Sequence, residues 1–383
     1  MPENNEFSEQ IEFLNYENIN EDLKLEEKPE KKIIKDLSKN FILKDFLAYS
    51  ESGKAIKIDK KNFYFFDLKP EFEKIKNKKI AFVDGGICEI LKSSLMGVYF
   101  NRIYYTIYQN NKRIKNYLVE FYSYIFPKIE EDKILLICEI FYFGEKKILY
   151  LKNNYNFDGF DKKISVNNKI VDIEIVANIV RRFAELNIIN EIEADYVVLD
   201  GSFDINYPDE EKILKYIIEE TKKKEKIILG LSKTNQFIIR GFPLSYFLNK
   251  VANESEKKEF IYYLDESDYS KVFFIKNIEQ SDFCFRLDLL NGFLNLNEIK
   301  NLNYLLNKKL KEIFFLLKEN SKDPIFLGYP YGLIEADMFA RISNKEKEQL
   351  MIRFLSLFGK EGKEIKKIFF MNKTHDVLDK IRF

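Results

Sequence analysis

The sequence predicts a mixed α/β protein in which antiparallel hairpins come first and βα units follow. Between residues 78 and 143, apolar runs rich in aromatic and β-branched residues succeed one another, which is typical of antiparallel strands. After residue 171, helical patterns alternate with short buried strands, which is typical of βα units. No internal repeat of roughly 20 to 50 residues occurs, so a solenoid or propeller is not indicated.

Each predicted element rests on a local pattern. Strands are expected where apolar, aromatic and β-branched residues run together, namely at 78–86, 95–108, 133–143, 195–202, 225–233, 272–276 and 283–290. Helices are expected where apolar residues recur at three- and four-residue steps, namely at 171–191, 210–224, 296–317 and from Pro330 through most of the remaining chain. A short extended piece should precede Pro330.

The N-terminal part divides into an acidic arm and a helical segment. Residues 1–30 hold ten acids and two lysines, and we expect either a flexible arm or a partner-binding helix. Because the whole chain has zero net charge, residues 31–383 carry +8, which is compatible with a polyanionic ligand and also with an ordinary solvated surface. Apolar spacing over 31–50 predicts a helical segment within 31–77.

Composition points to a soluble, cytoplasmic protein with reduced thiols. With 383 residues, 46% of them hydrophobic, the chain is long enough for one large or two ordinary domains. No apolar run approaches the roughly 18 residues of a membrane span, and the first ten residues lack a signal-peptide pattern. Cys88, Cys138 and Cys284 are far apart and form no CxxC, which argues against a disulfide framework or a zinc knuckle.

Several common catalytic motifs are absent from the sequence. Neither GxSxG, HExxH, GxxxxGK[ST] nor GxGxxG occurs, so hydrolase-triad, zinc-protease, Walker and dinucleotide-binding interpretations have no support. His375 is the only histidine, and any histidine-based nucleophile mechanism would have to use it.

Two predicted strands end on the same pair of residues. "KKIAFVDGG" places Asp84 before Gly85, and "DYVVLDGS" places Asp200 before Gly201. Carboxylates at the carboxyl ends of central strands point into the usual ligand crevice of an α/β sheet, where they suit Mg²⁺ or Mn²⁺. A single Asp-Gly is usually a turn signal, but two on buried strands favour a metal site for phosphodiester cleavage.

Glu185 and Lys233 are the next candidates. Glu185 lies on the helix that leads into the strand of Asp200, so its carboxylate could lean towards the strand end; the alternative is an i,i+4 salt bridge with Arg181. Lys233 closes the strand "IILGLSK", where an ammonium group could contact a phosphate; the alternative is a surface lysine with its stem on apolar neighbours.

The segment "GYPYGLIEAD" supplies the last two candidates. Tyr329 precedes Pro330 at a helix start, and Asp337 follows eight residues later, after a small residue that suits close packing. The alternative is a tyrosine hydroxyl that is merely satisfied in a domain seam, together with a surface aspartate.

Together, "VDGG", the helix with Arg181 and Glu185, "VVLDGS", "LSK" and "GYPYGLIEAD" resemble the NurA nuclease family over about residues 78–345. The resemblance implies an RNase H-like core with a mixed β-sheet flanked by helices, followed by a C-terminal helical extension at 346–383. It implies that Asp84, Glu185 and Asp200 bind the metal. Lys233 and Tyr329 then match the lysine and tyrosine of the family, and Asp337 stands where the family has a histidine.

The resemblance also implies an activity and partners. Family members are Mn²⁺-dependent nucleases, with Mg²⁺ as an alternative, that cut single-stranded DNA and degrade duplex ends in the 5′-to-3′ direction. They form homodimers that dock on a hexameric HerA-type helicase-translocase in DNA end resection and double-strand-break repair. The replacement of histidine by Asp337 would either add a fourth carboxylate or impair the site.

Two other functions remain open on sequence grounds. One is a catalytically weakened, nuclease-derived subunit that mainly binds a translocase, which the departure at Asp337 keeps in view. The other is an actin-like ATP-dependent phosphotransferase with the same core fold. That interpretation needs further glycine-rich phosphate loops, but the sequence contains a single Gly-Gly pair, Gly85-Gly86.

Overall fold

The computed structural model describes residues 47–49, 55–65, 75, 77–131, 133–233, 237–239, 242–254, 258–291 and 302–371. The chain separates into two units between residues 46 and 47, and the first unit lies wholly outside the described residues. The predicted acidic arm, the start of the predicted N-terminal helix and His375 therefore lie outside them too. All the elements described below belong to the second unit.

An 11-stranded mixed sheet forms the centre of this unit, in the order β3-β13-β14-β15-β10-β9-β4-β5-β6-β7-β8. Its inner strands are β15 (Phe285–Leu290), β10 (Ile227–Ser232), β9 (Tyr196–Asp200), β4 (Lys79–Lys92), β5 (Gly97–Gln109) and β6 (Lys112–Glu130). Its outer strands are β3 (Phe63–Tyr64), β13 (Phe260–Glu266), β14 (Ser270–Lys276), β7 (Lys133–Tyr142) and β8 (Asn154–Asp158).

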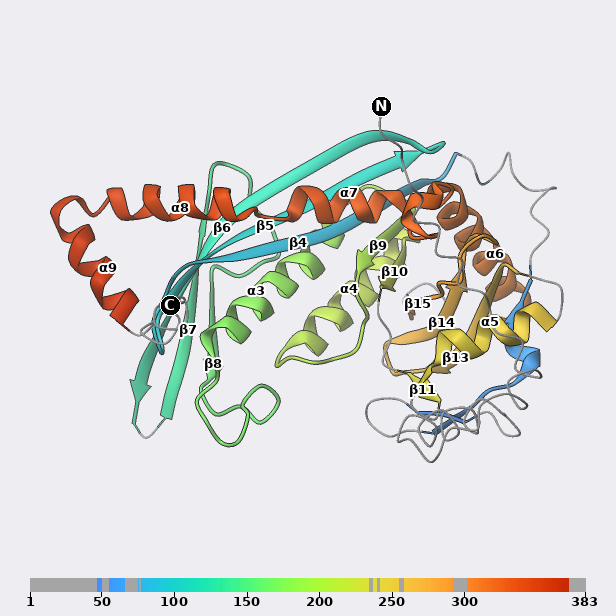
Figure 1. Ribbon diagram of the computed structural model, residues 1–383, viewed down its shortest axis with the longest axis horizontal. Helices are drawn as coiled ribbons and strands as arrows, with labels where there is room; N and C mark the ends of the chain where they lie inside the picture. Colours follow the sequence, from blue (N-terminus) through green and yellow to red (C-terminus); the bar gives the residue numbers. More distant parts are fainter. Residues whose placement is uncertain are drawn as a thin grey trace, which may run out of the picture. The chain divides into compact units, whose positions relative to one another are not determined.

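The middle of the sheet has the predicted change from antiparallel to parallel pairing. Strands β4, β5 and β6 form an antiparallel meander, and β4 then pairs in parallel with β9, which pairs in parallel with β10. Helix α3 (Ile173–Ile188) leads into β9, and helix α4 (Glu210–Lys224) joins β9 to β10 (Figure 1). The resulting order, β6-β5-β4-β9-β10, is that of an RNase H-like core, so the predicted fold class is confirmed.

Two apolar layers sandwich these strands because side chains alternate along each strand. On β4, Ala81 and Val83 pack in the cluster that contains α3, whereas Phe82 packs in the cluster that contains α6 (Leu302–Asn320) and α7 (Tyr331–Ala340). Helix α7 approaches β4 closely, since a Cβ built on Gly332 would lie 2.0 Å from the Phe82 ring. The alternation decides on which face each site residue of β4 and β9 lies.

The structure corrects three expectations. Strand β4 does not stop at Asp84-Gly85-Gly86 but continues to Lys92. The predicted helical segment at 31–77 is wrong at residues 47–64, where strands β1 (Leu47–Tyr49), β2 (Ala55–Lys57) and β3 and a 3₁₀ turn (Lys60–Asn62) lie instead. Before Pro330 the chain forms another 3₁₀ turn, Pro324–Phe326, in place of an extended piece.

The remaining described elements lie around this sheet. Strands β1 and β2 join β11 (Ile238–Ile239) and β12 (Phe242–Pro243) in a small sheet, and α5 (Leu244–Glu254) comes directly after it in the chain. The predicted C-terminal helices are present as α8 (Asn344–Ser356) and α9 (Gly362–Met371). No helix within the described ranges is long and apolar enough to cross a membrane.

Candidate metal centre

Asp84 and Asp200 lie side by side where the parallel pairing of β4 and β9 ends. Val83 is opposite Leu199 in the register, so the next residue of each strand is an aspartate. Both aspartates lie two positions after residues that pack towards α6 and α7, Phe82 on β4 and Val198 on β9, and therefore both face that layer. Strand β9 ends at Asp200, which opens the sheet at this point.

The carboxylate of Asp200 is held by the two residues that the sequence grouped with it. The Lys233 ammonium group, just beyond β10, donates to Asp200 Oδ2 at 2.8 Å. The Tyr329 hydroxyl lies 3.1 Å from Asp200 Oδ1 and also 3.1 Å from the Leu231 carbonyl oxygen. Burial and the charge of Asp200 raise the pKa of Tyr329 well above its ordinary value, so its hydroxyl keeps its proton.

Lys233 keeps its charge in this position. Partial burial lowers the pKa of Lys233, but the charge and hydrogen bond of Asp200 outweigh this effect, so the net shift is upward. Its ammonium group also lies 5.3 Å from the centre of the Tyr329 ring. Lys233, Tyr329 and Asp200 thus form one charged, hydrogen-bonded group.

Glu185 reaches the site from the other side of the sheet. It is on α3 and only 3% exposed, and its carboxylate lies over Gly85. A Cβ built on Gly85 would lie 2.5 Å from Glu185 Oε1, so a residue with a side chain would displace the carboxylate. The second glycine of the pair, Gly86, faces α7, where a Cβ would meet the Ala340 carbonyl oxygen at 2.0 Å. Both glycines are therefore explained by close approach rather than by a turn.

Glu185 also makes the salt bridge that was the alternative interpretation. The Arg181 guanidinium pairs with Glu185 Oε1, and Arg182 Nη1 lies 3.7 Å from Oε2. Burial raises the pKa of Glu185, and the two arginines oppose this shift. Arg181 also donates from Nη1 to the Gly85 carbonyl oxygen at 2.9 Å, which fixes the guanidinium between α3 and β4.

The pKa of Asp84 reflects both its burial and the negative charge of the other two carboxylates. Burial, then the charges of Glu185 and Asp200, raise the pKa of Asp84 to about 8, although the Gly85 amide donates to its Oδ1 at 2.7 Å. A group of partly buried carboxylates that raise one another's pKa is chemically suited to a hard divalent cation. Asp84, Glu185 and Asp200 are the residues that could hold Mn²⁺ or Mg²⁺.

The carboxylates are not arranged as a finished metal site. Among the described residues, no three His, Cys, Asp or Glu side chains lie close enough together to hold a metal ion as they stand. Glu185 is engaged by Arg181 and Asp200 by Lys233. Ligation of one ion by all three acids would therefore require their side chains to move closer.

Asp337 lies near this group but is engaged elsewhere. Its carboxylate pairs with Arg341 at the end of α7, with Oδ2 2.6 Å from Nη2. Its charge contributes to the upward pKa shifts of Lys233 and Tyr329. Asp337 thus acts on the other candidates through its negative charge, while its own ion pair is with Arg341.

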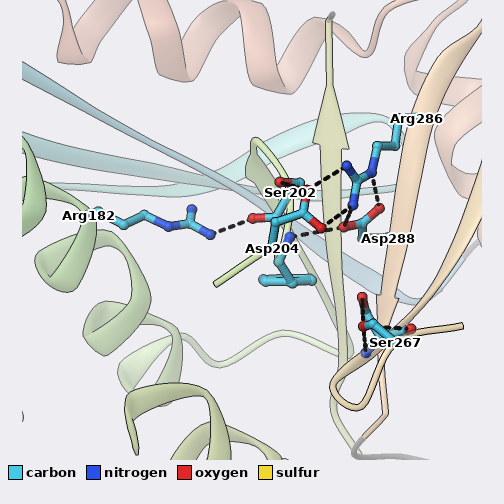
Figure 2. A network of polar contacts seen from close by, with 8 residues as sticks. Arg182, Ser202, Asp204, Ser267, Arg286 and Asp288 are labelled. Atoms are coloured by element: carbon cyan, nitrogen blue, oxygen red, sulfur yellow. Dashed lines mark hydrogen bonds and ion pairs between the residues drawn. The ribbon is translucent and has the colours of Figure 1, made fainter. Parts of the chain in front are cut away.

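A second polar network braces the loop that comes after Asp200, and the sequence did not predict it. Arg182 donates to the Ser202 carbonyl oxygen at 2.6 Å, and Arg286 pairs with Asp204 and with fully buried Asp288 (Figure 2). Asp288 also accepts from the Phe203 amide at 2.9 Å. The signal was present in "FRLDLL", where Arg286 and Asp288 are two positions apart and so share one face of the buried strand.

Comparisons with known proteins give weak structural likenesses. No family model and no curated protein sequence matches the chain. The catalytic domain of human endonuclease V is 7% identical, covers 73% of this chain and 89% of its own, and has a TM-score of 0.32. Endonuclease V of Ciona intestinalis, solved with a 24mer DNA containing an inosine, is 11% identical, covers 84% and 99%, and has a TM-score of 0.33.

A bacterial protein gives a similar result. Endonuclease V of Bacillus subtilis is 8% identical, covers 69% of this chain and 79% of its own, and has a TM-score of 0.29. TM-scores this low carry no argument about site or activity. The assignment of the core therefore rests on the strand order of the central sheet.

Proposed function

We propose that this chain is a divalent-metal-dependent DNA nuclease of the NurA type. The observation that supports this most directly is the juxtaposition of Asp84 and Asp200 on neighbouring parallel strands, with Glu185 reaching them across Gly85. Three carboxylates from three elements at one opening of a sheet suit phosphodiester hydrolysis better than they suit a purely structural role.

In this proposal the residues have distinct tasks. Asp84, Glu185 and Asp200 hold Mn²⁺, with Mg²⁺ as the alternative. A bound divalent cation supplies Lewis-acid activation of water and of the phosphate. Lys233 and Tyr329 orient Asp200 through its two oxygens, and Lys233 offsets negative charge near the phosphate.

The proposed biological role comes from the sequence resemblance. The substrate is single-stranded DNA and duplex ends, cut endonucleolytically and in the 5′-to-3′ direction during end resection and double-strand-break repair. The chain acts as a homodimer together with a hexameric HerA-type translocase.

The test is cleavage of labelled single- and double-stranded DNA with Mn²⁺, with Mg²⁺ or with EDTA. Asp84→Asn and Asp200→Asn should each abolish cleavage, because either change removes a charged ligand. Full activity of either variant, or activity in EDTA, would refute the metal-site assignment. Arg353→Lys, on α8, is a control that leaves the site untouched.

A second candidate is a catalytically weakened subunit that binds the translocase. Two observations favour it. Glu185 and Asp200 are each paired with a basic side chain, and Asp337, which stands where the family has a histidine, is paired with Arg341. If the native protein cleaves weakly and Asp337→His increases cleavage, impairment at this position is supported. If the native protein is fully active and Asp337→His lowers cleavage, the scaffold interpretation fails.

A further inference from the structure

Arg181 lies beside the acidic group and is not used by the proposed nuclease mechanism. Its side chain is 26% exposed, and its Nη1 atom makes its two side-chain hydrogen bonds to described residues, to Gly85 O and to Glu185. Its charge is felt by Asp84, whose pKa it lowers against the larger upward effects. Glu185 in turn raises the pKa of Arg181, so the guanidinium stays charged.

The Nε atom of the Arg181 guanidinium is buried and has no hydrogen-bond partner among the described residues. A buried, unpaired donor costs about 1 to 3 kcal/mol, so its persistence calls for an explanation. Arginine binds phosphate most strongly through two parallel N–H donors, and Nε belongs to one such pair.

Arg182, the neighbouring arginine, provides a comparison within the same helix. Its Nε donates to Glu210 at 3.1 Å and its Nη2 donates to the Ser202 carbonyl oxygen. Both the Nε and the Nη2 donors of Arg182 are therefore engaged in hydrogen bonds within the protein. Arg181 differs because its contacts fix one nitrogen only, which positions the side chain and leaves the Nε side for a ligand.

We propose that Arg181 is a phosphate-binding residue of this site, a role that rests on the proposed nuclease function. Gly85 O and Glu185 hold the guanidinium in place through Nη1. Because Nε is buried as it stands, its side receives a backbone phosphate of the DNA strand only when the side chains around the acids move, as ligation of one ion by all three acids also requires. Lys233 lies on the α7 side of the acids and Arg181 on the α3 side, so two cations flank the carboxylates. Phosphate bound near three acids needs such flanking positive charge.

The experiment measures DNA affinity rather than cleavage. Binding of a fluorescent single-stranded oligonucleotide is monitored by anisotropy at several salt concentrations, in Ca²⁺, with gel analysis to verify that the strand stays intact. Arg181→Lys keeps the charge but loses the two-donor geometry, so affinity should fall about tenfold with little change in salt dependence. Arg181→Gln removes the charge as well and should reduce the slope of log K against log salt by about 0.7.

Controls separate this role from a structural one. Arg353→Lys should bind as the native protein does, and thermal unfolding shows whether each Arg181 variant is folded. An oligonucleotide with neutral methylphosphonate linkages should bind the native protein and Arg181→Gln equally. If Arg181→Gln folds and binds DNA with native affinity and native salt dependence, the assignment is overturned. If only Arg181→Lys folds, native affinity in that variant overturns it.

Failure of the wider proposal gives a different pattern. A native protein that binds DNA through Arg181 but cuts nothing with Mn²⁺ would refute the nuclease and leave the phosphate-binding residue in place. A native protein that binds no DNA would overturn both.

Discussion

Replacement of Asp84 by asparagine should stabilise the metal-free protein while it removes a metal ligand. The pKa of Asp84 is raised from 3.8 to about 8, so the folded state favours the neutral acid. The folded protein then binds more protons than the unfolded chain between about pH 4 and pH 8, and stability falls as the pH rises through this window. Asparagine is neutral at every pH and removes that loss.

The size of the expected change in stability follows from the pKa shift of Asp84. At about 1.4 kcal/mol per pKa unit, a shift of about four units corresponds to roughly 6 kcal/mol above pH 8. Because Asp84 is partly exposed, relaxation of solvent and of neighbouring side chains reduces the change between about pH 5 and pH 8.5 to about 2 kcal/mol.

Urea unfolding in EDTA measures this difference directly. The native protein should lose about 2 kcal/mol of unfolding free energy between about pH 5 and pH 8.5, relative to Asp84→Asn. Asp268→Asn, in the exposed turn between β13 and β14, controls for the general effect of removing a carboxylate. Parallel pH profiles for the native protein and Asp84→Asn would show that burial and the neighbouring acids do not raise the pKa of Asp84 in the folded protein. Added Mn²⁺ should stabilise the native protein and leave Asp84→Asn unchanged.

Two further changes probe the surroundings of the site. Gly85→Ala should lower the unfolding free energy by about 1 to 3 kcal/mol and weaken Mn²⁺ binding measured by calorimetry, because its Cβ would lie 2.5 Å from Glu185 Oε1; native Mn²⁺ affinity would contradict this. Asp288→Asn should cost about 3 kcal/mol in urea unfolding, because Arg286 loses a buried charged partner; a change near zero would show that Asp204 alone balances that arginine.

Much of the core could be predicted because its elements are locally consistent. The helix at 210–224 has helical periodicity, and the buried strands at Tyr196–Asp200 and Ile227–Ser232 are short apolar runs, so all three form as expected. Lys233 was expected near the two aspartates because the carboxyl ends of strands in an α/β sheet meet at one crevice, whereas Tyr329 was placed with them only by the family resemblance.

The remainder depends on tertiary contacts that local patterns do not encode. The Gly85-Gly86 pair is a turn signal in isolation, but β5 pairs with both residues and extends the strand, and each glycine makes room for a neighbouring element. Arg181 was interpreted only as a helical neighbour of Glu185, since its bond to Gly85 O spans 96 residues of sequence. Strand β1 lies inside the stretch 31–50 that has helical spacing, and its pairing with β2 and with the distant β11 overrides that spacing.

The continuous β4 strand also limits how this protein can change in length. Its pairing with β5 is unbroken from Lys79 to Glu89, and the first register shift comes between Glu89 and Leu91. A one-residue insertion or deletion before Asp84 would turn its carboxylate towards α3, away from Asp200. A similar change between Gly86 and Glu89 would reverse the faces of the following residues while leaving the site in place. The irregularity after Glu89 is therefore the first position where related proteins can gain or lose a residue without reversing either face.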